Sequence, residues 1–231
     1  MPLPVLEVPT YETIVPSTRK PVKYRPFLVK EHKVLLMLKD AESKDITRIV
    51  SEVVDNCTFN KLKIDQLAFF DLVHLFIELR KASIGEVLDL IVNCECGTKI
   101  ETQTNLGSAK IINSEGHQNR IALSRSVAID MRYPHLDEGL EAYLSTDADK
   151  VIDLLCDCIV GVHQDNEFYD ARESTREEMV NFIEQLNTKQ LEKLMSFFST
   201  MPRVVLDVVT DCPSCKKHHE LKLEGLDNFF V

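Results

Sequence analysis

The chain has 231 residues, of which 44% are apolar and 28% are charged, and its formal net charge is −10. These values are those of a folded globular protein with a hydrophobic core, and they favour a folded chain over an intrinsically disordered one. An acidic surface repels nucleic acids and anionic membranes, and no concentrated basic patch interrupts it. We therefore expect no nucleic-acid partner and no membrane partner.

The first residues lack the basic start and the apolar stretch of a secretory signal. No apolar run approaches the roughly 20 residues that span a bilayer. We expect a soluble protein made in a cytoplasm, where its seven cysteines stay reduced. Pairs among these cysteines then favour a metal site over disulfides.

The first thirty residues are rich in proline, with prolines at positions 2, 4, 9, 16, 21 and 26. Proline lacks an amide donor and restricts its neighbours, so we expect an extended arm that lies on this protein or on a neighbour. Residues 11–15 and 22–24 suit a hairpin across residues 16–20.

Three helices are predicted next, starting at residue 29, at residue 46 and at residue 64. The second ends near Cys57, and the third, over 64–82, is apolar around most of its circumference. A helix this apolar is largely enclosed. Its remaining polar stripe carries Asp71, His74, Glu78 and Lys81.

Alternating residues over 86–105 then predict two strands around the turn Cys94-Glu-Cys96-Gly97. Residues 121–123 and 127–131 are expected to form further short strands.

A second helical region is expected from Pro134. It holds a helix over 147–160, a helix opened by a capping box at Ser174–Glu177, and a helix capped by Thr188 that ends before Pro202. Strands are expected over 204–209 and 219–223, on either side of the last turn, Cys212-Pro-Ser-Cys215. This second hairpin is a weak internal repeat of the first.

The predicted fold class is α+β, with antiparallel zinc-ribbon-like hairpins, two helical segments and an extended N-terminal arm. The expected boundaries are an arm over 1–30, a helical segment over 31–86, a β module of 87–133 with 203–231, and a second helical segment over 134–202. We expect these parts to form one integrated domain. Two hairpins alone do not give the order of the strands.

Cys94, Cys96, Cys212 and Cys215 are the predicted metal ligands. Zn²⁺ prefers four thiolate or imidazole ligands in a tetrahedron, and two cysteines in one tight turn supply half of that set. Each pair follows an apolar strand and precedes a more polar one. The pattern predicts one structural Zn²⁺ per chain, with no open coordination position for catalysis.

Other interpretations remain for these cysteines. A single C-x2-C pair is also typical of a redox dithiol, and a C-x-C turn can hold ordinary surface cysteines. His218 and His219 are alternative ligands, although their place in a strand favours solvent exposure. Cys57, Cys156 and Cys158 lie in predicted helices, where buried cysteines are common.

Asp71, His74 and Glu78 are the best catalytic candidates, because one helical stripe carries all three. Such a stripe is more often the solvated or interface side of a core helix. His117, His135 and His163 have no patterned partner, and no nucleophile elbow, P-loop or dinucleotide fingerprint is present. We expect no enzyme and no small-molecule substrate.

Residues 24–33 read YRPFLVKEHK and follow an arm that contains VPTYE. With the helix end LRKASIG, the CECG turn, Phe197–Phe198 before Pro202 and the final CPSC hairpin, they resemble the baseplate hub family of contractile-tailed bacteriophages of the T-even type. The likeness spans nearly the whole chain, and YRPFLVKE is its most specific part. It implies a small baseplate protein, described in the family as a hub component or hub-assembly factor, and it implies no catalytic residue.

The first functional hypothesis is therefore a structural component of the baseplate hub in the virion, assembled in the host cytoplasm, that bridges neighbouring tail proteins. The alternatives are a hub-assembly chaperone absent from the mature virion and a zinc-ribbon adaptor, which the net charge disfavours. Expected partners are other tail and baseplate hub proteins, with the tape-measure protein as one candidate. Arms and apolar termini often make partner contacts, and the residues expected to do so are Tyr24, Arg25, Phe27, Phe229 and Phe230.

Overall fold

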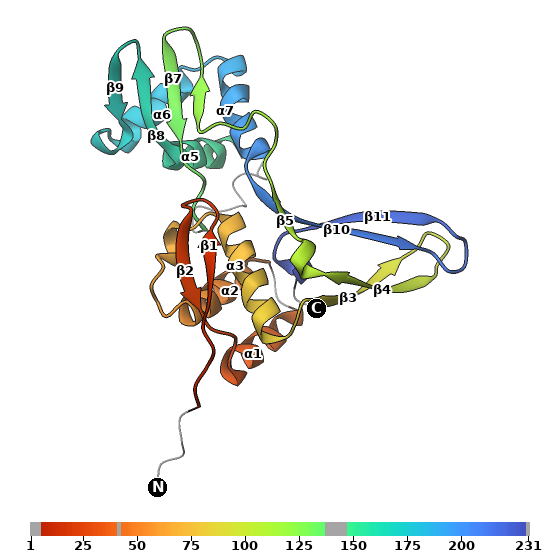
Figure 1. Cartoon of the computed structure of the whole chain (residues 1–231). Helices are drawn as coiled ribbons and strands as arrows, with labels where there is room; N and C mark the ends of the chain where they lie inside the picture. Colours follow the sequence, from red (N-terminus) through yellow and green to blue (C-terminus); the bar gives the residue numbers. More distant parts are fainter. Residues whose placement is uncertain (1–5, 41–42, 137–146, 230–231) are drawn as a thin grey trace. The chain divides into compact units, whose positions relative to one another are not determined.

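The computed structural model describes residues 6–40, 43–136 and 147–229. The chain divides into two compact units, one of Met1–Ile112 with Arg203–Val231 and one of Asn113–Pro202 (Figure 1). Both units combine helices with small antiparallel sheets, so the mixed α+β class is confirmed. Among the described helices, none is long and apolar enough to cross a bilayer.

The first unit begins with a hairpin followed by helices. Its elements are β1 (Tyr11–Val15), β2 (Lys20–Tyr24), α1 (Val29–Leu36), η1 (Met37–Asp40), α2 (Ser43–Cys57), η2 (Ile64–Gln66) and α3 (Phe69–Ser83). Tyr11 pairs with Tyr24, and Val15 with Lys20, which confirms the predicted hairpin. Helix α3 forms the centre of this core, as its apolar circumference predicts; its buried apolar side chains are Phe70, Leu72, Val73, Leu75, Phe76, Ile77 and Leu79.

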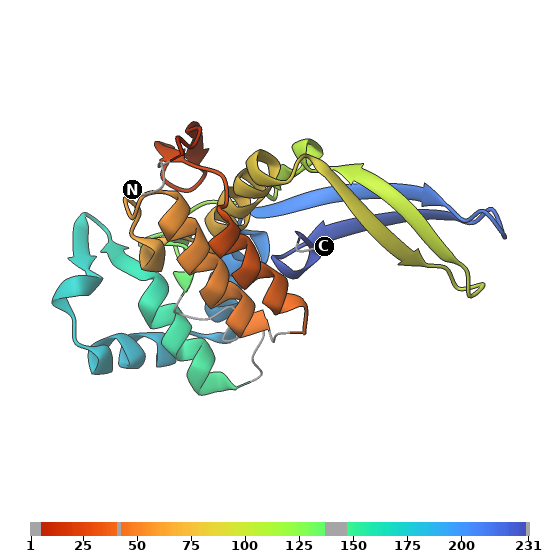
Figure 2. The same ribbon diagram turned by 90° about the horizontal axis from the view of Figure 1, so that it is seen from below.

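Two hairpins complete the first unit. The first is β3 (Val87–Asn93) with β4 (Lys99–Asn105), followed by η3 (Leu106–Ser108) and β5 (Lys110–Ile112). The second is β10 (Arg203–Asp211) with β11 (His218–Glu224), followed by η6 (Asp227–Phe229). The hairpins belong to separate sheets, β3-β4 and β11-β10-β5. Figures 1 and 2 show the hairpins running out from the helices side by side, with their two turns together at the far end.

Alternation along the strands sorts the residues of the two hairpins into inner and outer sets. Val92 and Ile100 are paired across β3 and β4, and both are buried against Cys212 and Leu221. Ile91, one residue away on β3, is 64% exposed. A strand places successive side chains on opposite faces, so the inner faces of the hairpins pack together and hold the turns in place.

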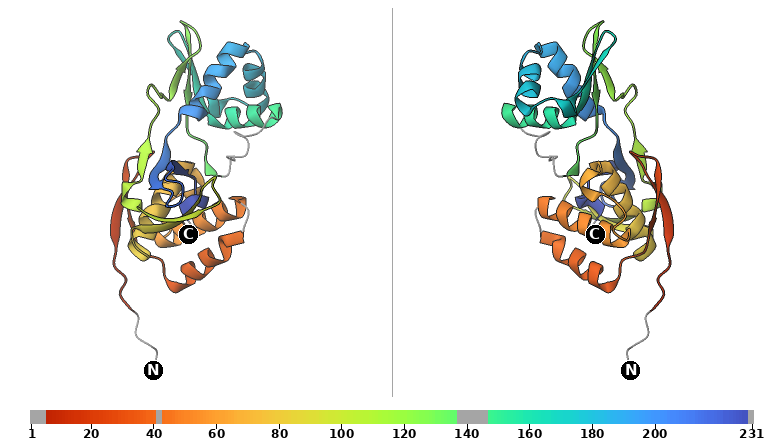
Figure 3. Two further views of the ribbon diagram at one scale, coloured as in Figure 1. Left: turned by 90° about the vertical axis from the view of Figure 1, so that its right-hand side faces the viewer. Right: turned by 90° about the vertical axis from the view of Figure 1, so that its left-hand side faces the viewer.

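The second unit is a four-stranded antiparallel sheet, in the order β6-β7-β8-β9, with helices on one face (Figure 3). Its elements are β6 (Arg120–Ala122), β7 (Val127–Met131), α5 (Ala148–Cys158), β8 (Ile159–Gln164), β9 (Glu167–Asp170), η5 (Ala171–Glu173), α6 (Arg176–Glu184) and α7 (Thr188–Thr200). Ile129, Leu154, Leu155 and Leu194 are at most 1% exposed in its core. This unit therefore has a hydrophobic core of its own.

The strand pairing differs from the expected boundaries. Residues 120–131 pair with β8, and not with the cysteine hairpins as the predicted 87–133 module requires. The expected helix over 147–160 ends at Cys158, and strand β8 starts at Ile159. Buried and exposed side chains alternate over the first three residues of this strand. The segment 134–202 thus contributes strands as well as helices. Its predicted start at Pro134 leads into residues 137–146, which lie outside the described residues.

Two helix caps also shift by one residue. Thr175, not Ser174, caps α6, and its amide donates to Glu178 at 2.7 Å. Asn187, not Thr188, caps α7 and accepts from the Gln190 amide at 3.1 Å. The capping chemistry was predicted correctly, but Ser, Thr and Asn serve as caps almost equally well, so sequence leaves the register open.

Candidate metal centre

The first turn, between β3 and β4, is closed by two backbone hydrogen bonds. The Cys94 amide donates to the Thr98 carbonyl at 2.9 Å, and the Gly97 amide donates to the Cys94 carbonyl at 2.9 Å. Gly97 has a φ of +84°, in the left-handed region where glycine carries no steric cost. The sequence C-E-C-G therefore folds into a turn that projects both sulfurs to one side.

The second turn, between β10 and β11, is closed in a similar way. The Cys212 amide donates to the Lys217 carbonyl at 2.9 Å, and the Lys216 amide donates to the Cys212 carbonyl at 3.0 Å. Here Lys216 takes the left-handed position, with a φ of +61°. This backbone costs a non-glycine residue roughly 1–2 kcal/mol, which the two backbone hydrogen bonds of the turn help to offset.

The two turns bring the four predicted ligands together. All four Sγ atoms lie within 4.8 Å of one another. Cys94 and Cys215 are 3.6 Å apart, as are Cys96 and Cys212. A disulfide needs about 2.05 Å, whereas a tetrahedron with Zn–S bonds of about 2.3 Å spaces its sulfurs by about 3.8 Å. The spacing fits a four-thiolate metal site.

Backbone amides point at these sulfurs. Cys94 accepts a hydrogen bond from the Cys96 amide, and Cys212 accepts from the amides of Cys215 and Ser214. Amides that converge in a turn stabilise negative charge on an acceptor. The turns are therefore suited to thiolates, the form of cysteine that binds metal.

The pKa values of the cysteines diverge within the cluster. Hydrogen bonds to Thr98 lower the pKa of Cys96 to about 6, and the Cys215 amide leads the causes that lower the pKa of Cys212. The Cys96 amide also favours the Cys94 thiolate, but burial and the neighbouring thiols outweigh it and raise the Cys94 pKa to about 12. Like charges this close do not all ionise without a counter-charge. A dication bound between the turns would supply the charge that four thiolates require.

Further contacts join the two turns. Thr98 Oγ1 lies 3.3 Å from Cys96 Sγ and 3.0 Å from Ser214 Oγ, within hydrogen-bond distance of both. Lys217 Nζ forms an ion pair with Glu95 Oε2 at 2.7 Å. Exposed ion pairs contribute little free energy, so we assign this pair to alignment of the turns rather than to stability.

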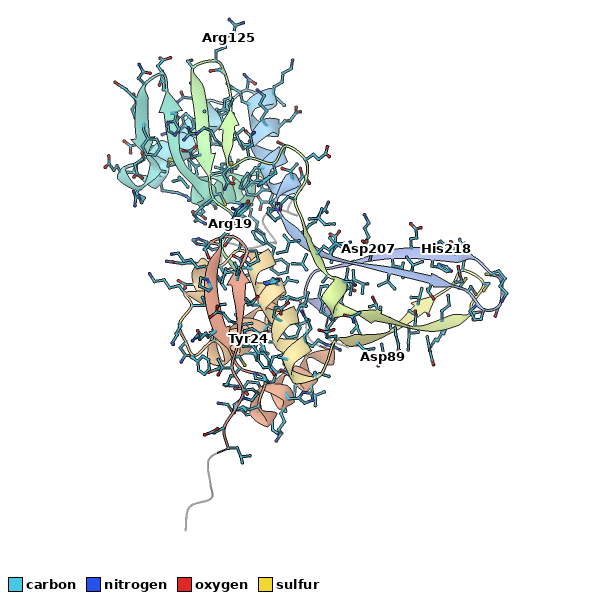
Figure 4. All side chains as sticks on the ribbon, viewed as in Figure 1. Arg19, Tyr24, Asp89, Arg125, Asp207 and His218 are labelled. Atoms are coloured by element: carbon cyan, nitrogen blue, oxygen red, sulfur yellow. The ribbon has the colours of Figure 1, made fainter. Side chains whose placement is uncertain are left out.

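His219 was expected to face solvent, but its Nε2 lies 3.3 Å from Cys94 Sγ. It shares the inner face of β11 with Leu221, and this two-residue alternation was the signal available in the sequence. His218 instead contacts Asp211 at 2.7 Å, which leads the causes that raise its pKa, and it lies at the far end of the hairpin (Figure 4).

The other three cysteines take the predicted places in helices. Cys57 ends α2 and is fully buried, and burial raises its pKa to about 11. Cys156 and Cys158 belong to the core of the second unit. These thiols are structural core residues rather than part of the four-cysteine cluster.

The polar stripe of α3 is covered by the β1–β2 hairpin. Asp71 accepts from the Ser17 amide at 2.8 Å and from the Ser17 hydroxyl at 2.5 Å. His74 Nε2 lies 3.2 Å from Thr13 Oγ1, and Glu78 makes a side-chain hydrogen bond with Tyr24. Asp71, His74 and Glu78, the best catalytic candidates from the sequence, thus anchor the β1–β2 hairpin of the chain's own arm.

The residues expected to contact partners make contacts inside the first unit. Tyr24 is 5% exposed and stacks on Tyr11, and Arg25 forms an ion pair with Glu31 at 2.9 Å. Phe27 stacks on Phe76. Phe229 is fully buried, and Phe230 lies outside the described residues. The described side chains of this set are therefore engaged within the chain itself.

Comparison with known proteins gives a family. Residues 8–231 match the family described as T4 bacteriophage base plate protein. A relative is the baseplate hub assembly protein gp26 of Enterobacteria phage T4, which is 27% identical over 223 residues that cover 91% of this chain and 93% of that protein. No solved structure matches the chain. With a family match over nearly its whole length, the chain belongs to the T4 bacteriophage base plate protein family.

Proposed function

We propose that this chain is a structural component of the phage tail baseplate hub that bridges neighbouring tail proteins. The observation that carries the proposal is the family match over residues 8–231, together with the relative named as a baseplate hub assembly protein. The role needs neither a catalytic residue nor a small-molecule substrate. Its partners are other tail and baseplate hub proteins, with the tape-measure protein as one candidate, and its location is the virion.

A second candidate role is assembly of the hub without a place in the mature particle. The printed name of the T4 relative, an assembly protein, favours it. The two roles share partners, but they differ in whether the chain remains in the tail once the tail is complete.

Quantitative mass spectrometry of purified virions and of assembly intermediates separates the two roles. A structural component occurs in virions at a fixed ratio to other baseplate proteins. Presence in intermediates and absence from virions supports the assembly role instead. Absence from both contradicts both roles.

We further propose that Cys94, Cys96, Cys212 and Cys215 bind one Zn²⁺ per chain and make a zinc-ribbon-like clasp from the two hairpins. The convergence of four sulfurs, with pairs at 3.6 Å, supports this proposal. Four protein ligands leave no open position, so the ion is structural. When bound, it links residues before position 100 to residues after position 210.

Cobalt substitution tests the ligand set. Co²⁺ bound by four thiolates in a tetrahedron gives intense d–d absorption and a sulfur-to-metal charge-transfer band. We expect both in the wild-type chain and in Cys57→Ala, which removes a thiol outside the cluster. Cys215→Ser is expected to weaken the charge-transfer band. Equal spectra for the wild type and Cys215→Ser would rule out the assigned ligands.

A further inference from the structure

Helix α1 and the η1 turn that follows it expose four large apolar side chains. Val29 and Met37 are each 77% exposed, Leu36 is 54% exposed and Val34 is 39% exposed. Within the described residues of α2, α3, α5, α6 and α7, no large apolar side chain is as exposed as any of these four. The exposed face of α1–η1 is therefore distinct from the surfaces of the other helices.

These side chains share one face of the helix. Val29, Lys33 and Leu36 are spaced i, i+4 and i+7, so they form one row. Lys30, Val34 and Met37 form the adjacent row with the same spacing. Together the two rows make a surface of apolar residues and lysines, here called the α1 face, that measures about 12 Å along the axis from helical rises of roughly 1.5 and 2.0 Å per residue.

The charge of the α1 face is opposite to that of the chain as a whole. Lys30 is 69% exposed and Lys33 is also exposed, whereas the net charge is −10. The one carboxylate of α1, on Glu31, points inward: it is 4% exposed and pairs with Arg25 at 2.9 Å. Lys30 also reaches Glu31 at 3.5 Å, which leaves Lys33 as the lysine without a described ion pair on this face.

A second copy of the chain is a poor occupant. Two α1 faces in contact would bring lysines against lysines, and like charges in an interface are unfavourable. The other described helices offer acidic residues but no comparable exposed apolar row. An occupant that complements this face combines apolar side chains with carboxylates, and the other described helices of the chain do not expose both together.

We propose that the α1 face binds an amphipathic helix of another baseplate protein, whose apolar row packs on Val29, Leu36 and Met37 and whose carboxylates face Lys30 and Lys33. Helices commonly dock by such an apolar row with i, i+3, i+4 and i+7 anchors. A partner helix segment of about 8 residues matches the length of the face. The inference rests on the proposed function for its setting and adds the binding surface and the chemistry of the partner.

Photo-crosslinking during assembly tests this inference. Benzoylphenylalanine replaces Met37 in one variant and Val209, a 59% exposed side chain on β10, in a control. Each is supplied to cells infected with a phage whose own gene for this chain carries an early stop codon. Position 37 is expected to crosslink to a segment of another baseplate protein with carboxylates beside an apolar helical row, and position 209 is not. Mass spectrometry of the crosslinked peptide identifies the segment.

Charge reversal gives the second measurement. Lys33→Glu is expected to lower the crosslink yield at position 37 and the number of infectious particles at least tenfold, whereas Lys189→Glu, at an exposed site on α7, is expected to change neither. Both variants must melt at the wild-type temperature. Crosslinks to a second copy of the chain, crosslinks to a segment without carboxylates, or equal yields at positions 37 and 209 would overturn the inference. If wild-type protein itself fails to rescue the phage, the proposed function fails instead.

Discussion

At the scale of single residues, His219 lies next to the proposed metal ligands without being one of them. In the tautomer that carries the proton on Nε2, His219 lies 3.3 Å from Cys94 Sγ and can donate a hydrogen bond that reduces the charge on the thiolate. Such outer contacts orient ligands, and their loss typically weakens metal binding by about 10- to 100-fold. The site was predicted from cysteine spacing, but the role of His219 depends on the pairing of strands that are far apart in the sequence.

His219→Leu removes this donor and is expected to accelerate zinc release about tenfold. The measurement is the rate at which a chromogenic chelator takes the metal from the purified protein. His218→Leu is the matched control, because His218 contacts Asp211 and Glu220 rather than a sulfur. Identical release rates for both variants would show that the contact with Cys94 has no effect on the metal.

Asp130 gives a pH-dependent contribution to the second unit. Arg120 binds it through two nitrogens, at 2.6 and 2.8 Å, and His163 Nε2 lies at 2.8 Å. The hydrogen bonds from Arg120 lead the causes that lower the Asp130 pKa to about 2. Because the folded state lowers this pKa, the stabilisation is present above the unfolded value of about 4 and is lost as the pH falls towards 2.

Asp130→Asn is expected to lower the free energy of unfolding by about 1 kcal/mol at pH 7, after allowance for solvent screening. The difference from the wild type should shrink between pH 4 and pH 2. Urea denaturation across this range measures it, with Glu184→Gln, at an exposed site on α6, as the control. A difference that stays constant with pH would contradict the role given to the carboxylate.

At the scale of elements, the β1–β2 hairpin is held on α3 by the Asp71 carboxylate. The side chain is fully buried, and it accepts from Ser17 and from the Ala68 amide at 3.1 Å. Burial raises its pKa, while these hydrogen bonds act in the opposite direction. One carboxylate therefore caps α3 and anchors the hairpin.

Asp71→Leu leaves the Ser17 and Ala68 amides without their acceptor and is expected to cost about 3 kcal/mol of unfolding free energy. Chemical denaturation gives the total loss, and hydrogen exchange of the β1 and β2 amides shows whether the hairpin detaches first. Asp65→Ala, at an exposed site, should stay within about 0.5 kcal/mol of the wild type. Unchanged protection in β1–β2 would assign the cost to the helix cap alone.

Local patterns predicted many of the elements. The β1–β2 hairpin, α3 and the two cysteine turns follow from proline placement, apolar periodicity and cysteine spacing, all of which act within about 20 residues. Strand β8 was missed because Ile159 continues the apolar pattern of α5 for one more residue, so no local signal marks the change. The separate sheet of β6 and β7 also depends on non-local pairing, which a single sequence does not specify.

At the scale of the whole molecule, the four cysteines close the first unit around a long insertion. The chain leaves this unit after Ile112 and returns at Arg203, and the 113–202 segment has its own core. A metal that fixes both turns limits the separation of strands from opposite ends of the sequence. Its binding free energy then contributes to folding of the first unit.

Metal removal is therefore expected to affect the two units differently. Hydrogen exchange after treatment with a chelator should show loss of protection in the parts of β3–β4 and β10–β11 next to the turns, where only Val92, Ile100 and Leu221 pack with the cysteines. Helices α5, α6 and α7 should keep their protection, because their core does not include the cysteine cluster. Equal loss in both units would show that they fold as one cooperative body.

The zinc content of the natively purified protein shows whether the four clustered cysteines hold a metal ion. Elemental analysis is expected to give about one Zn²⁺ per chain for the wild type and for Cys57→Ala, and much less than one for Cys212→Ser, which should also be strongly destabilised. A folded wild-type chain that contains no zinc, and whose stability is unchanged by Cys212→Ser, would contradict the account.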